Sequence, residues 1–499
     1  MLTHPIGYLI FPIMMTNNGW NFNNTYSLLP KEFYSKQHPV PVPSPKLILF
    51  NDDLVQKLGL DFKPLQIQDI SLFLSGNSLP AGADPLAQAY AGHQFGHFTM
   101  LGDGRAILLG EHLSPEGRRW DIQLKGSGKT PYSRGGDGRA ALGPMLREYI
   151  ISEAMNSLGI PTTRSLAVVS TGETVFRDSP QPGAILTRVA SSHIRVGTFE
   201  YLRFYNNPEY LKVLVKYTID RHFPEIKNQE NPTLELLNSV IIRQVDLIIH
   251  WLRVGFIHGV MNTDNMAISG ETIDYGPCAF MNIYDPATVF SSIDHKGRYC
   301  FENQPAMAQW NLARFAETLL PLLHNDHDQA LVLATEAINS FSSNLTKNWL
   351  KMMRIKLGLI TEEENDLPLI NELLQLMYLN KIDFTNTFRK LSLSLMINQD
   401  QFSETELLKW IIRWKDRLSR QTTSLQESVN LMHLHNPAFI PRNHKVEEAL
   451  DAATNQNDFS LIHKLLNVLS QPYLEQPNFS DYQTLPESND NNYKTFCGT

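Results

Sequence analysis

Apolar residues follow two different periods along the chain, which divide it into a strand-rich stretch and a longer helical stretch. Between about residues 98 and 200, short apolar or alternating runs bounded by glycine and proline predict strands at 105–110, 120–125, 165–170 and 184–188. One helix interrupts them, because apolar residues recur every four positions from Leu142 to Leu158, before Gly159 and Pro161. From about residue 205 the period is helical, with predicted helices at 234–252, 305–323, 329–358, 366–378, 404–420 and 459–469.

The two ends of the chain are less regular. The proline-rich stretch 39–45 predicts an extended segment that packs on another part of the molecule. The tail after residue 475 is polar and predicts irregular structure. We therefore expect an α+β protein in four parts: an N-terminal extension (1–80), a sheet-containing lobe (81–200), an enlarged helical lobe (201–475) and a C-terminal tail (476–499).

Composition narrows the class of protein. The 499 residues are 42% hydrophobic and 19% charged, which is ordinary for a globular protein, and the net charge of -8 does not suggest a nucleic-acid partner. No apolar run approaches the roughly 20 residues of a membrane span, and the apolar run 8–15 is too short for a signal peptide. Three cysteines are too few for a disulfide scaffold, so we expect a cytoplasmic protein that does not enter a membrane.

The most informative motif is His258-Gly-Val-Met-Asn-Thr-Asp-Asn265, followed by Asp274-Tyr-Gly276. Protein kinases have a His-x-Asp triplet that supplies the base, an Asn five residues later that binds metal, and a later Asp-Phe-Gly that holds a second metal. Asn265 keeps that spacing here, but Val260 replaces the aspartate base. Asn265 and Asp274 are therefore candidate Mg²⁺ ligands, and Asp264 is a candidate proton acceptor. A plain turn would explain Asn-Thr-Asp-Asn but not the Asp-Tyr-Gly that follows.

The order of predicted elements agrees with this motif. A sheet with one inserted helix, followed by a helical half, is the element order of a bilobal protein-kinase-like fold, and other α+β arrangements remain open. Lys125 at the end of a predicted strand and Glu148 on the inserted helix match the kinase Lys–Glu ion pair, with Glu153 as a competing partner. The Gly-Lys-Thr that follows Lys125 is not a P-loop, because Gln123 stands where the first glycine is required. The alternative for Lys125 is an ordinary surface lysine.

Two loops could approach phosphate groups. The loop with Gly102, Gly104 and Arg105 precedes a strand, where glycines let the backbone come close to an anion, or where Asp-Gly simply forms a hairpin turn. The loop with Asp137 and Gly138 lies before the inserted helix and is either an anion site or a capped loop.

Two arginines and two histidines complete the set of candidates. Arg188 and Arg195 could together bind a polyphosphate through their guanidinium groups, or each could form a surface salt bridge. His93 and His97 have helical spacing, but the glutamate of a zinc-protease motif is absent and Gly96 weakens a helix. We therefore do not expect a metal site at these histidines.

Taken together, these motifs resemble the selenoprotein O family, also called the YdiU or protein adenylyltransferase family. The resemblance covers nearly the whole chain and is carried by Asn24–Tyr26, Gln88–Gly96, Leu101–Ala106, Gln123–Gly128, Tyr132–Arg139, His258–Asn265 and Thr272–Pro277. It implies a kinase-like fold and the transfer of AMP, rather than phosphate, from ATP to Ser, Thr or Tyr hydroxyls of protein substrates. It also implies that ATP lies reversed relative to its orientation in kinases.

The resemblance further implies roles for individual residues. ATP contacts would come from Gly102, Gly104, Arg105, Lys125, Asp137, Gly138, Arg188, Arg195 and Asp274. Asp264 would be the proton acceptor, Asn265 and Asp274 would bind Mg²⁺ or Mn²⁺, and Glu148 would pair with Lys125.

Members of this family have selenocysteine or cysteine near the C-terminus, where this chain has Cys497. The resemblance therefore suggests a redox pair of Cys497 with Cys300 or Cys278. We expect a monomer. Two other functions remain open: an inactive nucleotide-binding pseudokinase scaffold, which Val260 alone favours, and a conventional ATP-dependent kinase.

Overall fold

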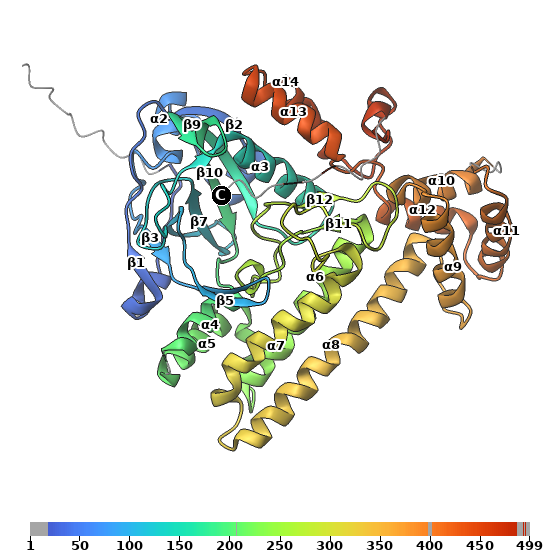
Figure 1. Cartoon of the computed structure of the whole chain (residues 1–499), viewed down its shortest axis with the longest axis horizontal. Coiled ribbons are helices and arrows are strands. Elements are labelled where there is room, and N and C mark those ends of the chain that lie inside the picture. The colour runs from blue at the N-terminus through green and yellow to red at the C-terminus, as the bar shows by residue number, and fades with distance from the viewer. Residues whose placement is uncertain (1–17, 206, 398–401, 487–492, 494, 496–499) are drawn as a thin grey trace, which may run out of the picture.

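A large antiparallel sheet is built from residues before 191, and the rest of the chain is mainly helical (Figure 1). The computed structural model describes residues 18–205, 207–397, 402–486, 493 and 495. The chain is therefore a mixed α/β protein with an antiparallel sheet, as the apolar pattern predicts. Within the described ranges, no helix combines the length and the apolar character that a membrane span requires.

Eight strands form the sheet, and neighbouring strands are antiparallel. Along the sheet the order is β1 (Tyr34–Lys36), β3 (Leu86–Gln88), β6 (Ala106–Leu113), β7 (Arg119–Lys125), β10 (Pro180–Ala190), β9 (Arg164–Phe176) and β2 (Lys46–Phe50), with β8 (Ala140–Ala141) beside β10. The four strands that the sequence predicts are confirmed as parts of β6, β7, β9 and β10.

Both outer strands of this order come from the first 50 residues. β1 lies at one edge and β2 at the opposite edge, and residues 37–45 connect them. This proline-rich connection packs on the sheet, because the Val40 amide donates to the Ser127 carbonyl oxygen at 2.8 Å. The Asn77 side chain bonds both backbone groups of Val42, at 2.9 and 2.8 Å. The expected packing of this segment is therefore confirmed, and its extended conformation stays a prediction.

Helices cover both faces of the sheet. α1 (Asp52–Leu58) and α2 (Ile67–Leu74) share one apolar cluster with Ile185, whereas its neighbour Leu186 belongs to the cluster on the opposite face. α3 (Leu142–Ser157), the predicted inserted helix, packs against β9 and β10. α13 (Asn443–Asn455) and α14 (Ser460–Leu469) come from the far end of the chain and pack against α3 (Figure 1).

The central helix of the second half, α6 (Pro232–Val254), leads directly into the candidate catalytic loop. The side chain of Asn231 caps its start by accepting from the Leu234 amide at 3.1 Å. Gly255 ends it with a φ of 74°, a left-handed conformation that favours glycine. β11 (Phe256–Ile257) follows at once and pairs with β12 (Ala279–Phe280), so the loop between them is held at both ends.

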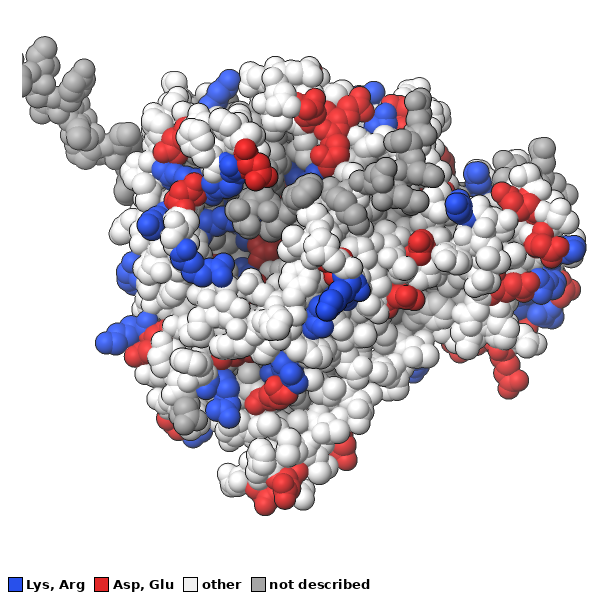
Figure 2. All heavy atoms as spheres, viewed as in Figure 1, with Lys and Arg blue, Asp and Glu red and all other residues white. Residues whose placement is uncertain are grey.

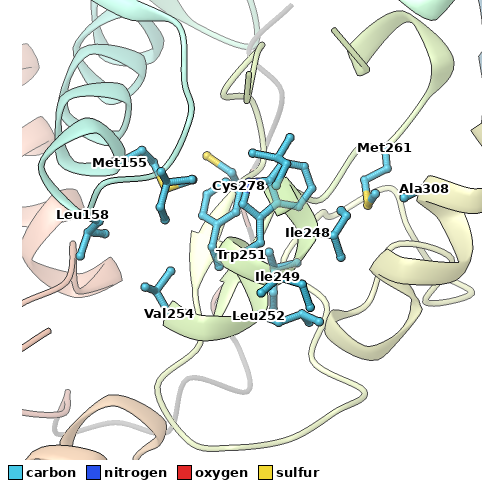
Figure 3. Close-up of a cluster of buried hydrophobic side chains, with 14 of the residues drawn as sticks. Met155, Leu158, Ile248, Ile249, Trp251, Leu252, Val254, Met261, Cys278 and Ala308 are labelled. Carbon is cyan, nitrogen blue, oxygen red and sulfur yellow. The ribbon is translucent and has the colours of Figure 1, made fainter. Parts of the chain in front are cut away.

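Apolar side chains anchor this loop on the helices (Figure 3). Met155 and Leu158 at the end of α3 meet α6 around Trp251, and Met261 and Cys278 of the loop reach the same cluster. All five side chains are buried. Because protein interiors are close-packed, such a cluster limits how far the loop can move.

Among the remaining helices, α4 (Val196–Phe204) and α5 (Pro208–His222) lie beside the sheet, and the others extend away from it (Figure 1). These others are α7 (Gln304–Leu323), α8 (His327–Lys356), α9 (Asp366–Leu379), α10 (Phe384–Met396), α11 (Thr405–Ser419) and α12 (Leu425–His435). The six helices predicted beyond residue 205 are confirmed as α6, α7, α8, α9, α11 and α14. Beyond residue 205 the sequence did not predict α5, α10, α12 and α13.

Candidate active site

A cavity of about 1230 Å³ lies between the sheet, α3 and the loop after α6. Every residue that the sequence singled out for nucleotide, metal or proton chemistry lines it: Gly102, Gly104, Arg105, Lys125, Asp137, Gly138, Glu148, Arg188, Arg195, Asp264, Asn265 and Asp274. Segments far apart in the chain therefore meet at one place. In Figure 2, Lys and Arg side chains gather on the sheet side of the face shown.

Two of the glycines allow close approaches of the backbone. Gly102 has a φ of 127°, and a Cβ atom there would lie 2.4 Å from the Tyr132 ring. Gly138 has a φ of 70°, and its Cβ would lie 2.2 Å from the Gly128 backbone. A larger residue at Gly102 would push its loop away from Tyr132, and one at Gly138 would push its loop away from Gly128. Either change would alter the shape of the cavity wall.

Buried charges connect the sheet to the catalytic loop. Lys125 Nζ lies 2.7 Å from a Glu148 carboxylate oxygen and 3.5 Å from Asp274 Oδ1. Arg188 donates to both carboxylates, and Arg195 Nη1 donates to Asp274 Oδ2 at 2.5 Å. Three cations thus share two carboxylates, which leaves a net positive charge beside the cavity. Such a charge attracts polyphosphate.

The competing residue Glu153 lies on the same helix but pairs elsewhere. Its carboxylate accepts from Arg164 at 2.6 and 3.0 Å and from the Ser165 amide at 2.9 Å. Five helical residues separate Glu153 from Glu148, so the two side chains leave α3 in different directions. Glu148 is the one that faces Lys125.

The environment of Asp274 keeps it ionised. Burial alone would raise the pKa of Asp274, but Arg188, Arg195 and Lys125 hold it well below its usual range. Burial is the largest influence on Lys125 and lowers its pKa. Asp274 also has a φ of 61°, a left-handed conformation that is unfavourable for a residue with a side chain. Strained backbone of this kind is concentrated at functional sites.

Hydrogen bonds hold the loop that carries the motif. His258 Nε2 lies 2.9 Å from the Ile273 carbonyl oxygen, which ties the start of the motif to the residue before Asp274. Asn265 Nδ2 donates to the Val260 carbonyl oxygen at 3.0 Å. The amide oxygen of Asn265 accepts no hydrogen bond from the part of the chain that the structure describes, and it is available to a ligand in the cavity.

Asp264 has a different environment from Asp274. Its Oδ1 is buried and has no hydrogen-bond partner among the described residues. Arg195 Nη1 donates to the backbone oxygen of Asp264 at 2.6 Å, not to its carboxylate. Burial raises the pKa of Asp264 to about 7, against the opposing influence of Arg195. A carboxylate with this pKa can accept a proton near neutral pH.

Oxygen donors from two residues could hold a divalent cation. The Asp274 carboxylate and the Asn265 amide belong to residues that line the cavity. In the described ranges no group of three His, Cys, Asp or Glu side chains forms a metal site. A carboxylate and an amide are hard oxygen donors that suit a hard divalent cation, and phosphate oxygens and water would fill its other positions.

The cavity also has residues that the sequence reasoning missed. The Tyr90 ring lies against Arg195, with the guanidinium carbon 4.6 Å from the ring centre. Arg177 bonds Asp137 at 2.9 and 3.0 Å and lowers the pKa of that carboxyl. Glu447 of α13 lies on the opposite wall. Tyr90 stands inside the quoted motif Gln88–Gly96, so a signal existed, whereas no signal in the sequence pointed to Glu447.

The remaining candidates are two histidines and three cysteines. His93 and His97 lie on β4 (Ala91–Gln94) and β5 (His97–Met100), which form a hairpin rather than a helix. Cys278 and Cys300 are both buried. Cys497 lies outside the described residues, so its pairing with either cysteine stays a prediction.

Comparison with known proteins agrees with the family resemblance of the sequence motifs. The family model described as protein adenylyltransferase SelO matches residues 17–470. A protein nucleotidyltransferase YdiU of Brevibacillus brevis is 60% identical over 481 residues, which cover 96% of this chain and 98% of that protein. The YdiU protein of Syntrophotalea carbinolica is 57% identical over 484 residues, which cover 97% and 98%. That of Halalkalibacterium halodurans is 58% identical over 482 residues, which cover 96% and 98%.

Proposed function

Because the chain belongs to the SelO family of protein adenylyltransferases, we propose that it transfers AMP from ATP to Ser, Thr or Tyr hydroxyls of protein substrates. The observation that carries this proposal is the contrast between two carboxylates in one cavity. Asp274 is surrounded by three cations, and Asp264 has an unpartnered oxygen and a pKa of about 7. A polyphosphate site and a proton acceptor are what nucleotidyl transfer requires.

In this proposal the nucleotide binds through its phosphates to the cationic wall. Lys125, Arg188 and Arg195 hold the triphosphate in the reversed orientation, with the α-phosphorus toward Asp264. Gly102, Gly104, Arg105, Asp137 and Gly138 contribute the remaining contacts. Asn265 and Asp274 would hold Mg²⁺ or Mn²⁺, which would offset negative charge on the phosphates.

The chemical step needs one proton acceptor. The hydroxyl of the substrate protein gives its proton to Asp264 while its oxygen attacks the α-phosphorus. The bond between the α-phosphorus and the bridging oxygen to the β-phosphorus breaks, and pyrophosphate leaves with the electron pair. Lys125, Arg188 and Arg195 stabilise the charge that develops on the leaving group. Glu148 keeps Lys125 and Arg188 in position.

The proposal extends to the architecture and to regulation. We regard 81–200 and 201–475 as two lobes of a kinase-like fold, with 1–80 as an extension and 476–499 as a tail, in a cytoplasmic monomer. A disulfide of Cys497 with Cys300 or Cys278 would restrain the segment after Asp274. A wild type that keeps all three thiols under oxidation, together with a Cys497→Ser variant of unchanged activity, would contradict this regulation.

Two alternatives make different predictions. Val260, in the place of the kinase base, favours an inactive nucleotide-binding scaffold, and the position of Asp264 beside the cavity leaves a conventional kinase possible. ATP labelled at the α or the γ position separates all three, with casein and the chain itself as acceptors. Label from the α position alone supports AMP transfer. Label from the γ position alone supports a kinase, and no label supports a scaffold.

A further inference from the structure

A buried polar cluster next to Asp264 has no role in the proposed mechanism. It consists of Glu200 on α4, Thr263 in the catalytic loop and His93 on β4, and we call it the Glu200 cluster. Thr263 directly precedes Asp264 in the chain. Glu200 is 5% exposed and Thr263 is fully buried.

The hydrogen bonds of this cluster fix the orientation of the Thr263 side chain. Its hydroxyl donates to Glu200 Oε2 at 2.5 Å and accepts from the His93 amide at 2.7 Å. The other carboxylate oxygen of Glu200, Oε1, lies 2.5 Å from His93 Nδ1. The Glu200 carboxylate thus bonds both the catalytic loop, through Thr263, and the β4–β5 hairpin, through His93. The His93 amide also bonds Thr263, so the hairpin and the loop are linked directly.

A second attachment lies one residue further back. The Asn262 side-chain oxygen accepts from the Phe95 amide at 3.0 Å and from the Tyr299 hydroxyl at 2.7 Å. Phe95 belongs to the turn of the same hairpin. The two residues before Asp264 are therefore both tied to residues 93–95, which restricts the backbone that carries the carboxylate.

The helix α4 connects these attachments to the phosphate site. Arg195 caps its start and bonds both the Asp264 backbone oxygen, at 2.6 Å, and Asp274 Oδ2, at 2.5 Å. Glu200 lies five residues later on the same helix and bonds Thr263. A single rigid element therefore sets the position of Asp264 relative to Asp274.

The hairpin also limits the carboxylate itself. A Cβ atom at Gly92 would lie 2.1 Å from Asp264 Oδ1, so the backbone of β4 lies directly against that oxygen. The backbone of Gly92 has no left-handed φ, so alanine is excluded there by space and not by conformation. Gly197 on α4 also approaches β4 closely, because a Cβ there would lie 1.9 Å from the Ala91 oxygen and 3.3 Å from the Asp264 Cα.

We propose that Glu200, Thr263 and His93 are positioning residues that hold Asp264 at the α-phosphorus of the bound nucleotide, with Gly92 leaving the space that its carboxylate requires. The inference rests on the proposed function of Asp264. A buried carboxylate is unfavourable unless its hydrogen bonds are complete, and apolar residues of the same size would pack at least as well. Packing alone therefore does not explain the Glu200 cluster, and its contacts indicate that it orients Asp264.

The first test compares two substitutions of one residue. Thr263→Val keeps the shape and removes the hydroxyl, whereas Thr263→Ser keeps the hydroxyl. The kcat and KM for ATP are measured from the transfer of α-labelled AMP to casein or to the chain itself, and nucleotide affinity is measured by calorimetry with a non-hydrolysable ATP analogue. We expect Thr263→Val to lower kcat about 10- to 100-fold, because small misplacements of a reacting group have effects of this size. The KM for ATP and the affinity should stay within about twofold, and Thr263→Ser should restore most of kcat.

The matched control is Thr387→Val on α10. Thr387 is also buried, at 1% exposed, and its hydroxyl also donates a hydrogen bond, in this case to the backbone oxygen of Asp383 and not to a side chain beside Asp264. Its kcat should equal that of the wild type. A Thr263→Val protein with wild-type kcat would overturn the proposal, and so would one that loses nucleotide binding together with kcat, since the residue would then be merely structural.

Gly92→Ala tests the same idea without removing a hydrogen bond. The added methyl group must displace the Asp264 carboxylate, so kcat should fall at least about tenfold while analogue binding is kept. Unchanged kcat in Gly92→Ala would show that the hairpin does not determine where Asp264 lies. If the wild type itself transfers no AMP, the proposed function is wrong, and this outcome is distinct from a failure of the positioning inference alone.

Discussion

The surroundings of Asp274 and of Asp264 differ more than the nine residues between them would suggest. Asp274 touches Lys125, Arg188 and Arg195, and these cations keep its pKa well below the usual range. Asp264 has an unpartnered oxygen in the described structure, and burial raises its pKa to about 7. One carboxylate is therefore permanently charged, and the other can change its charge near neutral pH.

This difference separates two roles that a single active site needs. A carboxylate that stays ionised organises cations, metal and phosphate, whereas a carboxylate with a raised pKa can take up a proton. The separation depends on neighbours and not on residue type. Substitutions of the two aspartates should therefore have different effects on activity, nucleotide affinity and stability.

The largest effect is expected from Asp274→Ala. Transfer should become undetectable, because the phosphate and metal site loses its shared carboxylate. Three buried cations would also lose one of the two carboxylates that they share, so unfolding free energy should fall by about 3–5 kcal/mol, as for other broken buried ion pairs. Labelled AMP transfer and the urea midpoint measure the two effects. Asp220→Ala, which removes a partner of the exposed Lys216, is the control and should change neither.

Asp264→Asn should lower activity without lowering stability. Loss of the proton acceptor should lower kcat about 10²- to 10⁴-fold, the range for general base catalysis. Affinity for a non-hydrolysable ATP analogue should be kept. The melting temperature at pH 8 should rise by about 2 °C, because a buried charge without a partner is removed. A variant that keeps its wild-type rate would exclude Asp264 as the acceptor.

The pH dependence should follow Asp264 in opposite directions for activity and stability. The kcat/KM should rise with pH through about 7, the pKa of Asp264, and fall about tenfold per unit below it. The folded state keeps a proton that the unfolded chain releases above its ordinary pKa of 3.8, so this group lowers stability as pH rises from there to about 7. Thermal melting of the wild type and of Asp264→Asn across this range should show that slope in the wild type only.

The smallest effect is expected from a pair of substitutions on α3. Glu148→Gln removes one of the two carboxylates that hold Lys125 and Arg188, so analogue affinity should fall about 3- to 10-fold, the size of one ordinary hydrogen bond. Glu153→Gln on the same helix should leave affinity unchanged, because its partner is Arg164. Equal affinities for both variants would remove Glu148 from the phosphate site.

Much of the fold and of the candidate site could be predicted because the signals are local. The strands β6, β7, β9 and β10 and the helices α3 and α6 have long, regular apolar periods. The residues from His258 to Asp274 form one short motif with kinase-like spacing, and the structure brings its acidic and amide side chains to one cavity. Which of Glu148 and Glu153 faces Lys125 needed the structure, because the helical period alone does not decide between them.

Other features could not be predicted because their cause lies in tertiary contacts. The buried face of α13 is made mainly of alanine, as Ala449 and Ala453 illustrate, so few large apolar residues mark this helix in the sequence. Glu200 stands alone in an apolar helix and would ordinarily be placed in solvent, yet it is buried against Thr263 and His93. The strands β1 and β2 are short, and their partners lie far away in the chain.

The connection between β1 and β2 has a length that the width of the sheet determines. Six interstrand spacings separate these outer strands, a distance of about 29 Å at ordinary strand separation. The ten steps from Lys36 to Lys46 would reach about 31 Å in a polyproline conformation. The segment therefore has little excess length. Removing two of its residues should pull β1 or β2 out of the sheet, whereas added residues should be tolerated.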